Sequence, residues 1–578
     1  MTRRQFVGQA AMPVLAAAQT PRPNVVLIMS DDQGYGDLSL HGNPHLQTPN
    51  LDKLGRQGVQ FSRFYVSPVC APTRASLLTG RYHLRSGVHG VTTGRETMRP
   101  NEVTIAEALK PAGYRTGLIG KWHLGENYPY VPHAQGFDEF IGFRTGHWTE
   151  YWNPPLERNG VPFRAEGFIA DVFTDEAIRF VEANAQRRFF LYLAYNTPHS
   201  PYLAPERYWE QYRSLGLPPQ VAAVYSMVAN LDENIGRFLQ SLDRLDLASN
   251  TVVMFLTDNG PNGQRYNAGM RGAKGSVYEG GVRVPFFIRW PRGFEGGREI
   301  DRIAGAIDVL PTVLDLCELR RPPAPPLDGV SLVPLLEGAV EHWPERMLFT
   351  HRGERDNPGA MYNGAVRTQR YNLVNGTELY DVLEDPGEKD NIAAGQPEVA
   401  AKLRAAYERW FKVAASQCGF SRPVVPVGYS EENPARLTAA QSYLTGGVTY
   451  SRGNGFAHEW VSNWKSPADA VHWEVEIVRP GRYEISARYL CPAADTGSKV
   501  RLTIAGRTLE AVVDTPTSME PATHRDLIPR TLEAPQMDWG TLTFGSVQLP
   551  AGRAQLRLQA VEKPGAAVME LEAIELKR

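Results

Sequence analysis

The sequence predicts an α/β fold, with a mixed, mostly parallel sheet flanked by helices, followed by a separate all-β sandwich. Four apolar runs in the first half of the chain each stop at a polar or glycine-bearing cluster, and helix-period segments lie between them. Strands that alternate with helices indicate crossover connections in an α/β sheet. Near the C-terminus the pattern changes to alternation with a period of two, which is typical of antiparallel strands in a sandwich.

Length and composition limit the possible classes of protein. A chain of 578 residues exceeds what one hydrophobic core usually supports, so two or three domains are expected. The 61 Lys and Arg residues nearly balance 63 Asp and Glu residues, which excludes the strongly basic character of a nucleic-acid binder. The four cysteines are too widely spaced for a disulfide framework or a zinc site: Cys70, Cys317, Cys418 and Cys491.

Residues 1–20 have the features of an export signal. Arg3 and Arg4 precede a mildly apolar stretch, and the small residues Ala16–Ala18 offer a cleavage site. This pattern is similar to a twin-arginine signal, so we expect export by the twin-arginine machinery to the periplasm or the extracellular space. The alternative is a disordered basic tail. The apolar stretch is too short for a membrane span of about 20 residues, and we expect no transmembrane segment elsewhere.

The elements of the α/β sheet follow one another along the chain. Strands are predicted at 24–30, 115–119, 189–195 and 251–256, and helices at 104–109, 173–183 and 224–245. In such sheets, ligands bind at the carboxyl ends of the strands. The polar clusters of this sequence fall at those ends, so we expect the functional site there.

Two of these clusters carry oxygen ligands for a metal ion. Asp31 and Asp32 follow the first strand, and Asp258 and Asn259 follow the strand at 251–256. Four hard oxygen-bearing side chains suit the ligand shell of Ca²⁺, with Mg²⁺ less expected. Carboxylates this close would raise one another's pKa unless a cation lay between them. The alternative is that these residues only cap turns or helices.

A motif around Cys70 adds a nucleophile. Cys70, Pro72 and Arg74, with Thr79 and Gly80 after them, resemble the signature of the formylglycine-dependent (type I) sulfatases of the alkaline phosphatase superfamily. The resemblance implies that a maturation enzyme oxidises Cys70 to formylglycine, whose hydrate attacks the sulfur of a sulfate ester, and that this residue also contacts Ca²⁺. Arg74, one helical turn further on, would orient its oxygens. The alternative is a buried free thiol.

Three further segments resemble sulfatase motifs in the same order. In Gly120–Gly125, the resemblance assigns Lys121 to a sulfate oxygen and His123 to the base that deprotonates the covalent intermediate. In Asn196–Pro201 it assigns His199 to protonation of the leaving oxygen, and Lys274 to contact with sulfate and leaving group. Cations around an anionic transition state fit electrostatic stabilisation. The resemblance covers about residues 24–415.

The resemblance also suggests domain limits. We expect a catalytic domain at 21–335, a small α+β C-terminal subdomain at 336–418, a proline-containing linker at 419–440 and the sandwich at 441–578. The strand entry at Pro480–Tyr483 is similar to that of the galactose-binding-like jelly rolls, which serve as carbohydrate-binding modules. Trp460, Trp464 and Trp539 could stack on sugar rings or form the core.

The substrate is the least defined part of the prediction. His147 and Trp148 lie in an aromatic loop that could stack on sugars, and His351 and Arg352 could reach the pocket rim. Together with the export signal and the possible sugar module, these residues favour a sulfated glycan. One alternative is a phosphonate monoester or phosphodiester hydrolase of the same superfamily, which also uses formylglycine. Another is a catalytically silent glycan-binding protein.

Overall fold

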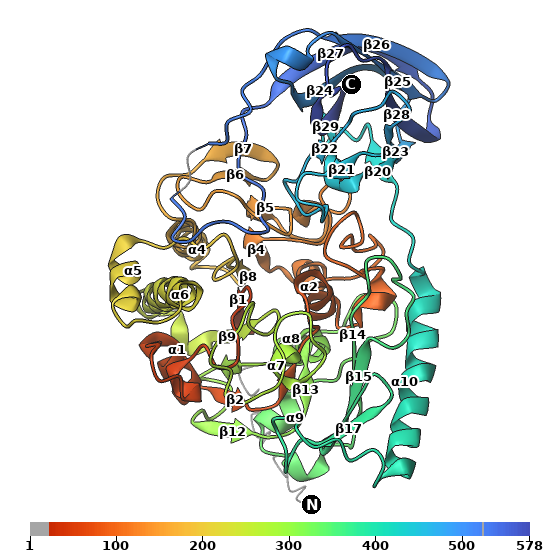
Figure 1. Cartoon of the computed structure of the whole chain (residues 1–578). Helices are drawn as coiled ribbons and strands as arrows, with labels where there is room; N and C mark the ends of the chain where they lie inside the picture. Colours follow the sequence, from red (N-terminus) through yellow and green to blue (C-terminus); the bar gives the residue numbers. More distant parts are fainter. Residues whose placement is uncertain (1–21, 523–524) are drawn as a thin grey trace, which may run out of the picture.

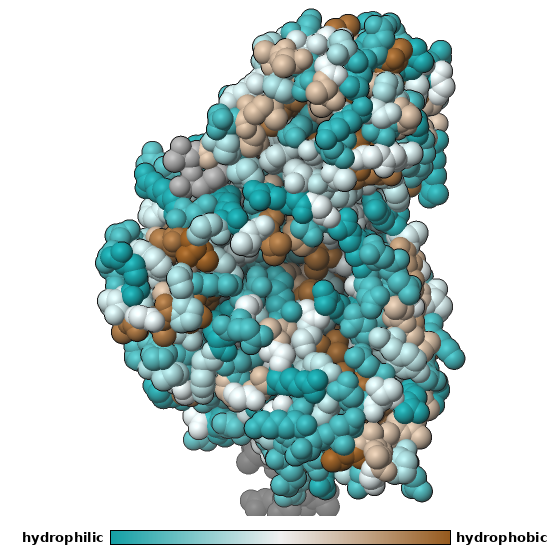
Figure 2. Space-filling model, in the orientation of Figure 1, coloured by the Kyte–Doolittle hydropathy of each residue, from teal (hydrophilic) through white to brown (hydrophobic). Residues whose placement is uncertain are grey.

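The computed structural model describes residues 22–522 and 525–578 (Figure 1). The predicted export signal at 1–20 lies outside the described residues. Within the described part of the chain, no helix has the length and the apolar character that crossing a membrane requires. Most of the face in Figure 2 is hydrophilic, and its hydrophobic patches are small and scattered.

A ten-stranded mixed sheet forms the centre of the larger part of the molecule, as predicted. Its strand order is β12-β2-β11-β9-β1-β8-β4-β5-β6-β7. The strands are β1 (Asn24–Ser30), β2 (Val59–Phe61), β4 (Arg115–Lys121), β5 (Glu139–Phe143), β6 (Pro155–Arg158), β7 (Val161–Arg164), β8 (Phe189–Ala194), β9 (Thr251–Thr257), β11 (Phe286–Arg289) and β12 (Arg298–Ile300). The central strands β9, β1, β8, β4 and β5 pair in parallel, and every residue of β1 is buried.

Helices cover both faces of this sheet because β1 is apolar on both sides (Figure 1). Val25, Leu27 and Met29 pack with α2 (Cys70–Thr79), α3 (Ile105–Leu109), α8 (Val309–Leu316) and α9 (Val333–Leu336). Val26 and Ile28 pack on the other face with α1 (Pro49–Gln57), α4 (Ile169–Ala183) and α6 (Pro219–Arg244). Alternate residues of a strand point to opposite faces, so one apolar run supplies two cores.

Smaller elements complete this part of the chain. A short sheet has the order β10-β3-β13, made of Arg283–Val284, Phe64–Tyr65 and Ala304–Gly305. Helix α5 (Glu206–Arg213) packs on α6, and α7 (Glu279–Val282) precedes β10. A four-stranded antiparallel sheet follows, comprising β14 (Leu348–His351), β15 (Gly364–Arg367), β16 (Tyr371–Val374) and β17 (Glu378–Asp381). The helix α10 (Pro397–Cys418) buries Leu403, Tyr407 and Trp410 beside this sheet.

The C-terminal part is a sandwich of two sheets around one core. The first contains β18 (Val425–Val427), β20 (Tyr443–Thr445), β23 (Ala470–Ile477), β25 (Ser498–Ile504), β26 (Arg507–Val513) and β28 (Gly552–Glu562). The second contains β19 (Ala435–Thr438), β21 (Thr449–Tyr450), β22 (Val461–Ser462), β24 (Gly481–Leu490), β27 (Gly540–Leu549) and β29 (Glu570–Lys577).

The segment 419–440, expected as a linker, differs from that expectation. It contains β18, which pairs with β23, and β19, which pairs with β29. Pro426 lies within β18 at the end of the strand order, where a missing backbone N–H costs little. Pro426 therefore lies in a strand at the edge of a sheet, and segment 419–440 is not a separate linker.

Of the three tryptophans that could stack on sugar rings or form the core, two are buried. Trp464 lies in the sandwich core with no exposed surface. Trp460 is also buried and packs edge to face against Trp539, with ring centroids 5.4 Å apart. These contacts favour a role of Trp460 and Trp464 in packing over a role in stacking on sugar rings.

Candidate active site

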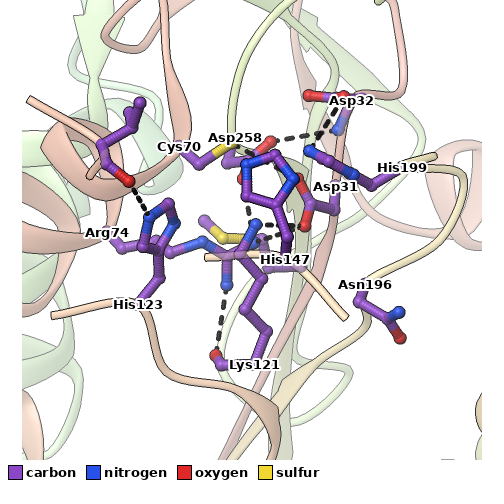
Figure 3. Close-up of polar contacts among 12 residues, drawn as sticks. Asp31, Asp32, Cys70, Arg74, Lys121, His123, His147, Asn196, His199 and Asp258 are labelled. Atoms are coloured by element: carbon purple, nitrogen blue, oxygen red, sulfur yellow. Dashed lines mark hydrogen bonds and ion pairs between the residues drawn. The ribbon is translucent and has the colours of Figure 1, made fainter. Parts of the chain in front are cut away.

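The predicted site residues converge at the carboxyl ends of the central strands (Figure 3). The parallel register of β1 and β9 pairs Ser30 with Thr257, so the polar residues that follow the two strands lie side by side. The backbone N–H of Asp32 donates to Asp258 Oδ1 at 3.1 Å, and Asn259 Nδ2 donates to Asp32 Oδ1 at 2.9 Å. The position of this cluster agrees with the expectation that functional residues gather at the carboxyl ends of parallel strands.

The oxygen-bearing cluster is buried and electrostatically crowded. Asp31, Asp32, Asp258 and Asn259 are at most 1 % exposed. Burial and the neighbouring Asp31 raise the pKa of Asp258 to about 6. Burial would also raise the pKa of Asp32, but Lys274 and His199 lower it below the usual range. The Oδ1 atom of Asn259 has no hydrogen-bond partner among the described residues.

Cys70 is the first residue of α2, and its side chain faces this cluster (Figure 3). Its Sγ donates to Asp31 Oδ1 at 3.5 Å. Burial and the nearby Asp258 raise the pKa of the thiol well above its usual value, so it stays protonated at neutral pH. Arg74 Nη2 donates to Asp258 Oδ2 at 2.8 Å and lies 3.6 Å from Asp31 Oδ2. Arg74 thus neutralises the carboxylates around Cys70.

Two lysines bring positive charge to the same place. Lys121, the last residue of β4, donates from Nζ to Asp31 Oδ2 at 2.6 Å. Lys274 lies in the connection between β9 and α7, and its Nζ lies 2.7 Å from Asp32 Oδ1. Burial opposes the charge of Lys274, but Asp32 and Cys70 raise the pKa of its ammonium group. Both lysines thus contact the carboxylates that surround Cys70.

Two histidines adjoin the cluster from different loops. His123 Nε2 lies 2.9 Å from the carbonyl oxygen of Val91, and its Nδ1 has no partner among the described residues. His199 Nδ1 lies 2.6 Å from the carbonyl oxygen of Ser200, and its Nε2 lies 3.6 Å from Asp32 Oδ2. Burial and Lys121 lower the pKa of His123, and burial and Lys274 lower that of His199 to about 4. Both imidazoles are neutral at pH 7.

Backbone strain is concentrated at two of these residues. Asp32 has φ 67° and His123 has φ 63°, in the left-handed region that residues other than glycine rarely adopt. Such strain costs about 1–3 kcal/mol per residue and gathers at functional sites. The fold holds both side chains in place against this cost.

A cavity of about 380 Å³ opens over Cys70. Of the predicted catalytic residues, Cys70, His123, His199 and Lys274 line it. Of the predicted substrate residues, His147 and Arg352 also line it. The cavity gives a ligand direct access to the cysteine that the sequence motif singled out.

Two predicted substrate residues, His351 and Trp148, do not line the cavity. His351 ends β14 and is fully buried, and its Nδ1 lies 3.0 Å from Tyr407 Oη. Adjacent residues at a strand end point in different directions, so only Arg352 reaches the cavity. Trp148 does not line the cavity but stacks on Phe143, with ring centroids 4.7 Å apart. Trp148 is partly buried and packs against the core around Phe143.

Sequence reasoning missed several cavity residues. Arg95 lies in the connection between α2 and α3, and Phe456, Leu532 and Glu533 come from the C-terminal sandwich. None belongs to a motif or to a periodic segment. Their only sequence signal is a charged or apolar residue in a loop, which is too common to identify a site.

Comparison with known proteins agrees with this geometry. Residues 23–319 match the family model described as Sulfatase, and residues 273–411 match N-sulphoglucosamine sulphohydrolase, C-terminal. Mouse (Mus musculus) N-acetylgalactosamine-6-sulfatase is 32 % identical over 382 residues, covering 60 % of this chain and 71 % of that protein. Human (Homo sapiens) arylsulfatase A is 32 % identical over 460 residues, covering 66 % of this chain and 86 % of that protein.

A solved structure shows the same similarity. The crystal structure of Ps i-CgsB in complex with k-i-k-neocarrahexaose is 27 % identical, with a TM-score of 0.64, and covers 70 % of this chain and 95 % of that one. Residues 412–578, which include the sandwich, lie outside both family models. The family model, the relatives and the buried cluster around Cys70 together show that this chain belongs to the type I sulfatase family of sulfuric ester hydrolases.

Proposed function

We propose that this protein hydrolyses a sulfate ester of a carbohydrate, with formylglycine formed from Cys70 as nucleophile and Ca²⁺ as cofactor. The observation that carries the proposal is the position of Cys70: it lines the cavity and lies close to Lys274 and to the buried oxygen cluster. An anionic ester group that enters the cavity meets positive charge and the nucleophilic position together.

The donor set fits calcium. Asp31, Asp32, Asp258 and Asn259 lie together and offer oxygen ligands, which hard cations prefer. The unpartnered Oδ1 of Asn259 is a buried acceptor that a cation would satisfy. Bound here, Ca²⁺ would supply positive charge that offsets the crowded carboxylates and polarises the ester oxygens. The raised pKa of Asp258 reflects the same crowding.

The protonated thiol of Cys70 is poorly suited to act as the nucleophile, which supports its conversion to formylglycine. A thiol whose pKa is raised by burial is a weak nucleophile. Formylglycine would supply the nucleophilic hydroxyl of its hydrate. Cys70 lies at the N-terminal end of α2, where the helix dipole favours negative charge. Lys121 and Lys274 supply positive charge for the sulfate oxygens, and Arg74 holds the carboxylates around the nucleophile.

The histidines differ in which nitrogen is free. His123 can donate from Nε2 to the Val91 carbonyl, which leaves the Nδ1 lone pair to accept a proton as general base. His199 can donate from Nδ1 to the Ser200 carbonyl, which leaves Nε2 to carry a proton toward the leaving oxygen. The charge of a bound sulfate ester would raise the pKa of His199 from its low value and favour that protonated form.

The relatives support a carbohydrate substrate. Their names include N-acetylgalactosamine-6-sulfatase, and a similar solved structure contains a neocarrahexaose. The cavity is lined by polar and charged side chains that could hold a sugar through hydroxyl groups. We also propose maturation of Cys70 by a formylglycine-generating enzyme and, from Arg3 and Arg4, export by the twin-arginine machinery.

The test combines mass and activity. Protein co-produced with a maturation enzyme is digested, and the peptide containing Cys70 is weighed. A loss of about 18 Da relative to the thiol is expected for the aldehyde. The protein should hydrolyse 4-nitrophenyl sulfate and sulfated oligosaccharides. Cys70→Ala should abolish both activities, whereas Cys418→Ala, at the end of α10, should not. Full activity in Cys70→Ala would overturn the proposal.

A further inference from the structure

The C-terminal sandwich reaches into the catalytic cavity. Two of its connections do so: the loop at 451–460 between β21 and β22, and the longer connection between β26 and β27, described at 514–522 and 525–539. Figure 1 shows the long segment in blue, extending from the sandwich to the α/β part near β6 and α4. The first supplies Asn454 and Phe456 to the cavity lining, and the second supplies Leu532 and Glu533.

The long segment is bonded to the α/β part before Glu533 and at Glu533 itself. The Leu527 N–H donates to the Tyr202 carbonyl at 2.9 Å. Arg530 Nη2 donates to the Thr149 carbonyl at 2.7 Å. Ser200 Oγ donates to Glu533 Oε1, which holds this carboxylate beside His199. The position of Glu533 in the cavity wall is therefore set by the fold.

The shorter loop fixes the neighbouring wall. Phe456 stacks on His147 with ring centroids 4.8 Å apart, and His147 meets His199 edge to face at 4.7 Å. His458 Nε2 lies 3.2 Å from the His147 carbonyl oxygen. His147 is thus held between the sandwich and the residue proposed to protonate the leaving group. The part of the cavity next to the leaving group is shaped by both parts of the molecule.

Glu533 has an unusual environment for a carboxylate. It is only 4 % exposed, yet among the described residues no Lys or Arg forms an ion pair with it. A buried carboxylate is costly unless hydrogen-bond donors satisfy its oxygens. Ser200 supplies one donor, and the other neighbours offered by the cavity wall are the neutral imidazoles of His147 and His199. A ligand with hydroxyl groups would donate to Glu533 Oε2, which, unlike Oε1, has no hydrogen bond to the described residues.

We propose that Glu533 is a specificity-determining residue that accepts hydrogen bonds from hydroxyl groups of the sugar carrying the reacting sulfate, and that its charge rejects a second anionic group there. This inference rests on the proposed sulfatase function. The sandwich then acts in substrate selection as a wall of the active site, in contrast to a separate carbohydrate-binding module. Like charges in one poorly solvated site repel strongly, so an adjacent second sulfate is disfavoured.

Steady-state kinetics with two kinds of substrate test the inference. Wild type, Glu533→Ala and Glu533→Gln are compared on galactose 6-sulfate and N-acetylgalactosamine 6-sulfate, on disulfated forms of these sugars, and on 4-nitrophenyl sulfate. The last has no sugar hydroxyl groups. Glu510→Gln is the control, because Glu510 is an exposed sandwich carboxylate paired with Lys499. Thermal unfolding of each variant establishes that it is folded.

We expect Glu533→Ala to lower kcat/KM for the monosulfated sugars by roughly 10- to 100-fold, mainly through KM, because hydrogen bonds to a charged acceptor are lost. Activity on 4-nitrophenyl sulfate should fall much less than activity on the sugars, because this substrate has no sugar hydroxyl group for Glu533 to bind. Glu533→Gln should raise kcat/KM for the disulfated sugars relative to kcat/KM for the monosulfated ones. Equal losses on sugar and aryl substrates, or no loss on either, would overturn the inference alone. A wild-type protein inactive on all sulfate esters would overturn the proposed function with it.

Discussion

Nη2 of Arg74 lies 2.8 Å from Oδ2 of Asp258, and both side chains are completely shielded from solvent. Removing one partner of such a pair leaves a buried charge uncompensated, which typically costs about 3–5 kcal/mol. We expect Arg74→Met to lower the urea midpoint of unfolding by a corresponding amount, as followed by tryptophan fluorescence.

Two comparisons establish the cause of that loss. The double variant Arg74→Met, Asp258→Asn should recover part of the stability, since it removes both charges. Arg56→Met should have little effect, because Arg56 is 63 % exposed in its pair with Asp52. If the loss of stability in the double variant equals the sum of the losses in the two single variants, the ion pair is not the source of the loss.

Calcium should stabilise the protein through Asn259. Ligand present at about 100 times its Kd adds about 2.7 kcal/mol to the free energy of unfolding. We expect EDTA to lower the Tm of wild-type protein and excess Ca²⁺ to restore it, with Mg²⁺ less effective. In Asn259→Leu the restoration should be much smaller, because the unpartnered Oδ1 is lost. An unchanged calcium response in that variant would place the ion elsewhere.

Lys274→Ala should reduce catalysis more than stability. Removing one group that stabilises an anionic transition state commonly lowers kcat by about 10²- to 10³-fold. We expect a loss of that size on 4-nitrophenyl sulfate, with partial activity in Lys274→Arg. Lys53→Ala, an exposed change in α1, serves as the control and should retain wild-type rates. Wild-type rates in Lys274→Ala would remove this cation from the mechanism.

Glu126 should make stability depend on pH away from the catalytic cluster. Burial and the neighbouring Glu96 raise its pKa from 4.5 to about 7. The folded state binds this proton more tightly than the unfolded state, so the stabilising contribution is complete below about pH 4.5 and is lost as the pH rises through about 7. Each unit of pKa shift corresponds to roughly 1.4 kcal/mol.

The measurement is Tm against pH for wild type and Glu126→Gln, which cannot ionise. The variant should gain in Tm relative to wild type between about pH 4.5 and 7, and the difference should level off above that range. Parallel curves for the two proteins would show that Glu126 titrates normally.

The parts of the site that sequence predicted lie at strand ends or in the segments that resemble sulfatase motifs. Asp31 and Asp258 were placed together because parallel neighbours end at one edge of a sheet. The direction of a side chain beyond a strand end is not encoded in that way, which is why His351 turned out buried against Tyr407. Glu533 was beyond reach, since 333 residues separate it from its partner Ser200 and no motif marks it.

The central position of β1 has a consequence for how the chain folds during synthesis. Its seven residues bond to β8 and β9, so the strand made first is completed only when residues up to Thr257 have emerged. Until then Val25 to Met29 is an apolar segment without its partners, which is prone to aggregation. Pairing between distant parts of a chain is slow because loop closure must precede it. We therefore expect that shielding β1 until the sheet is complete favours productive folding of this protein.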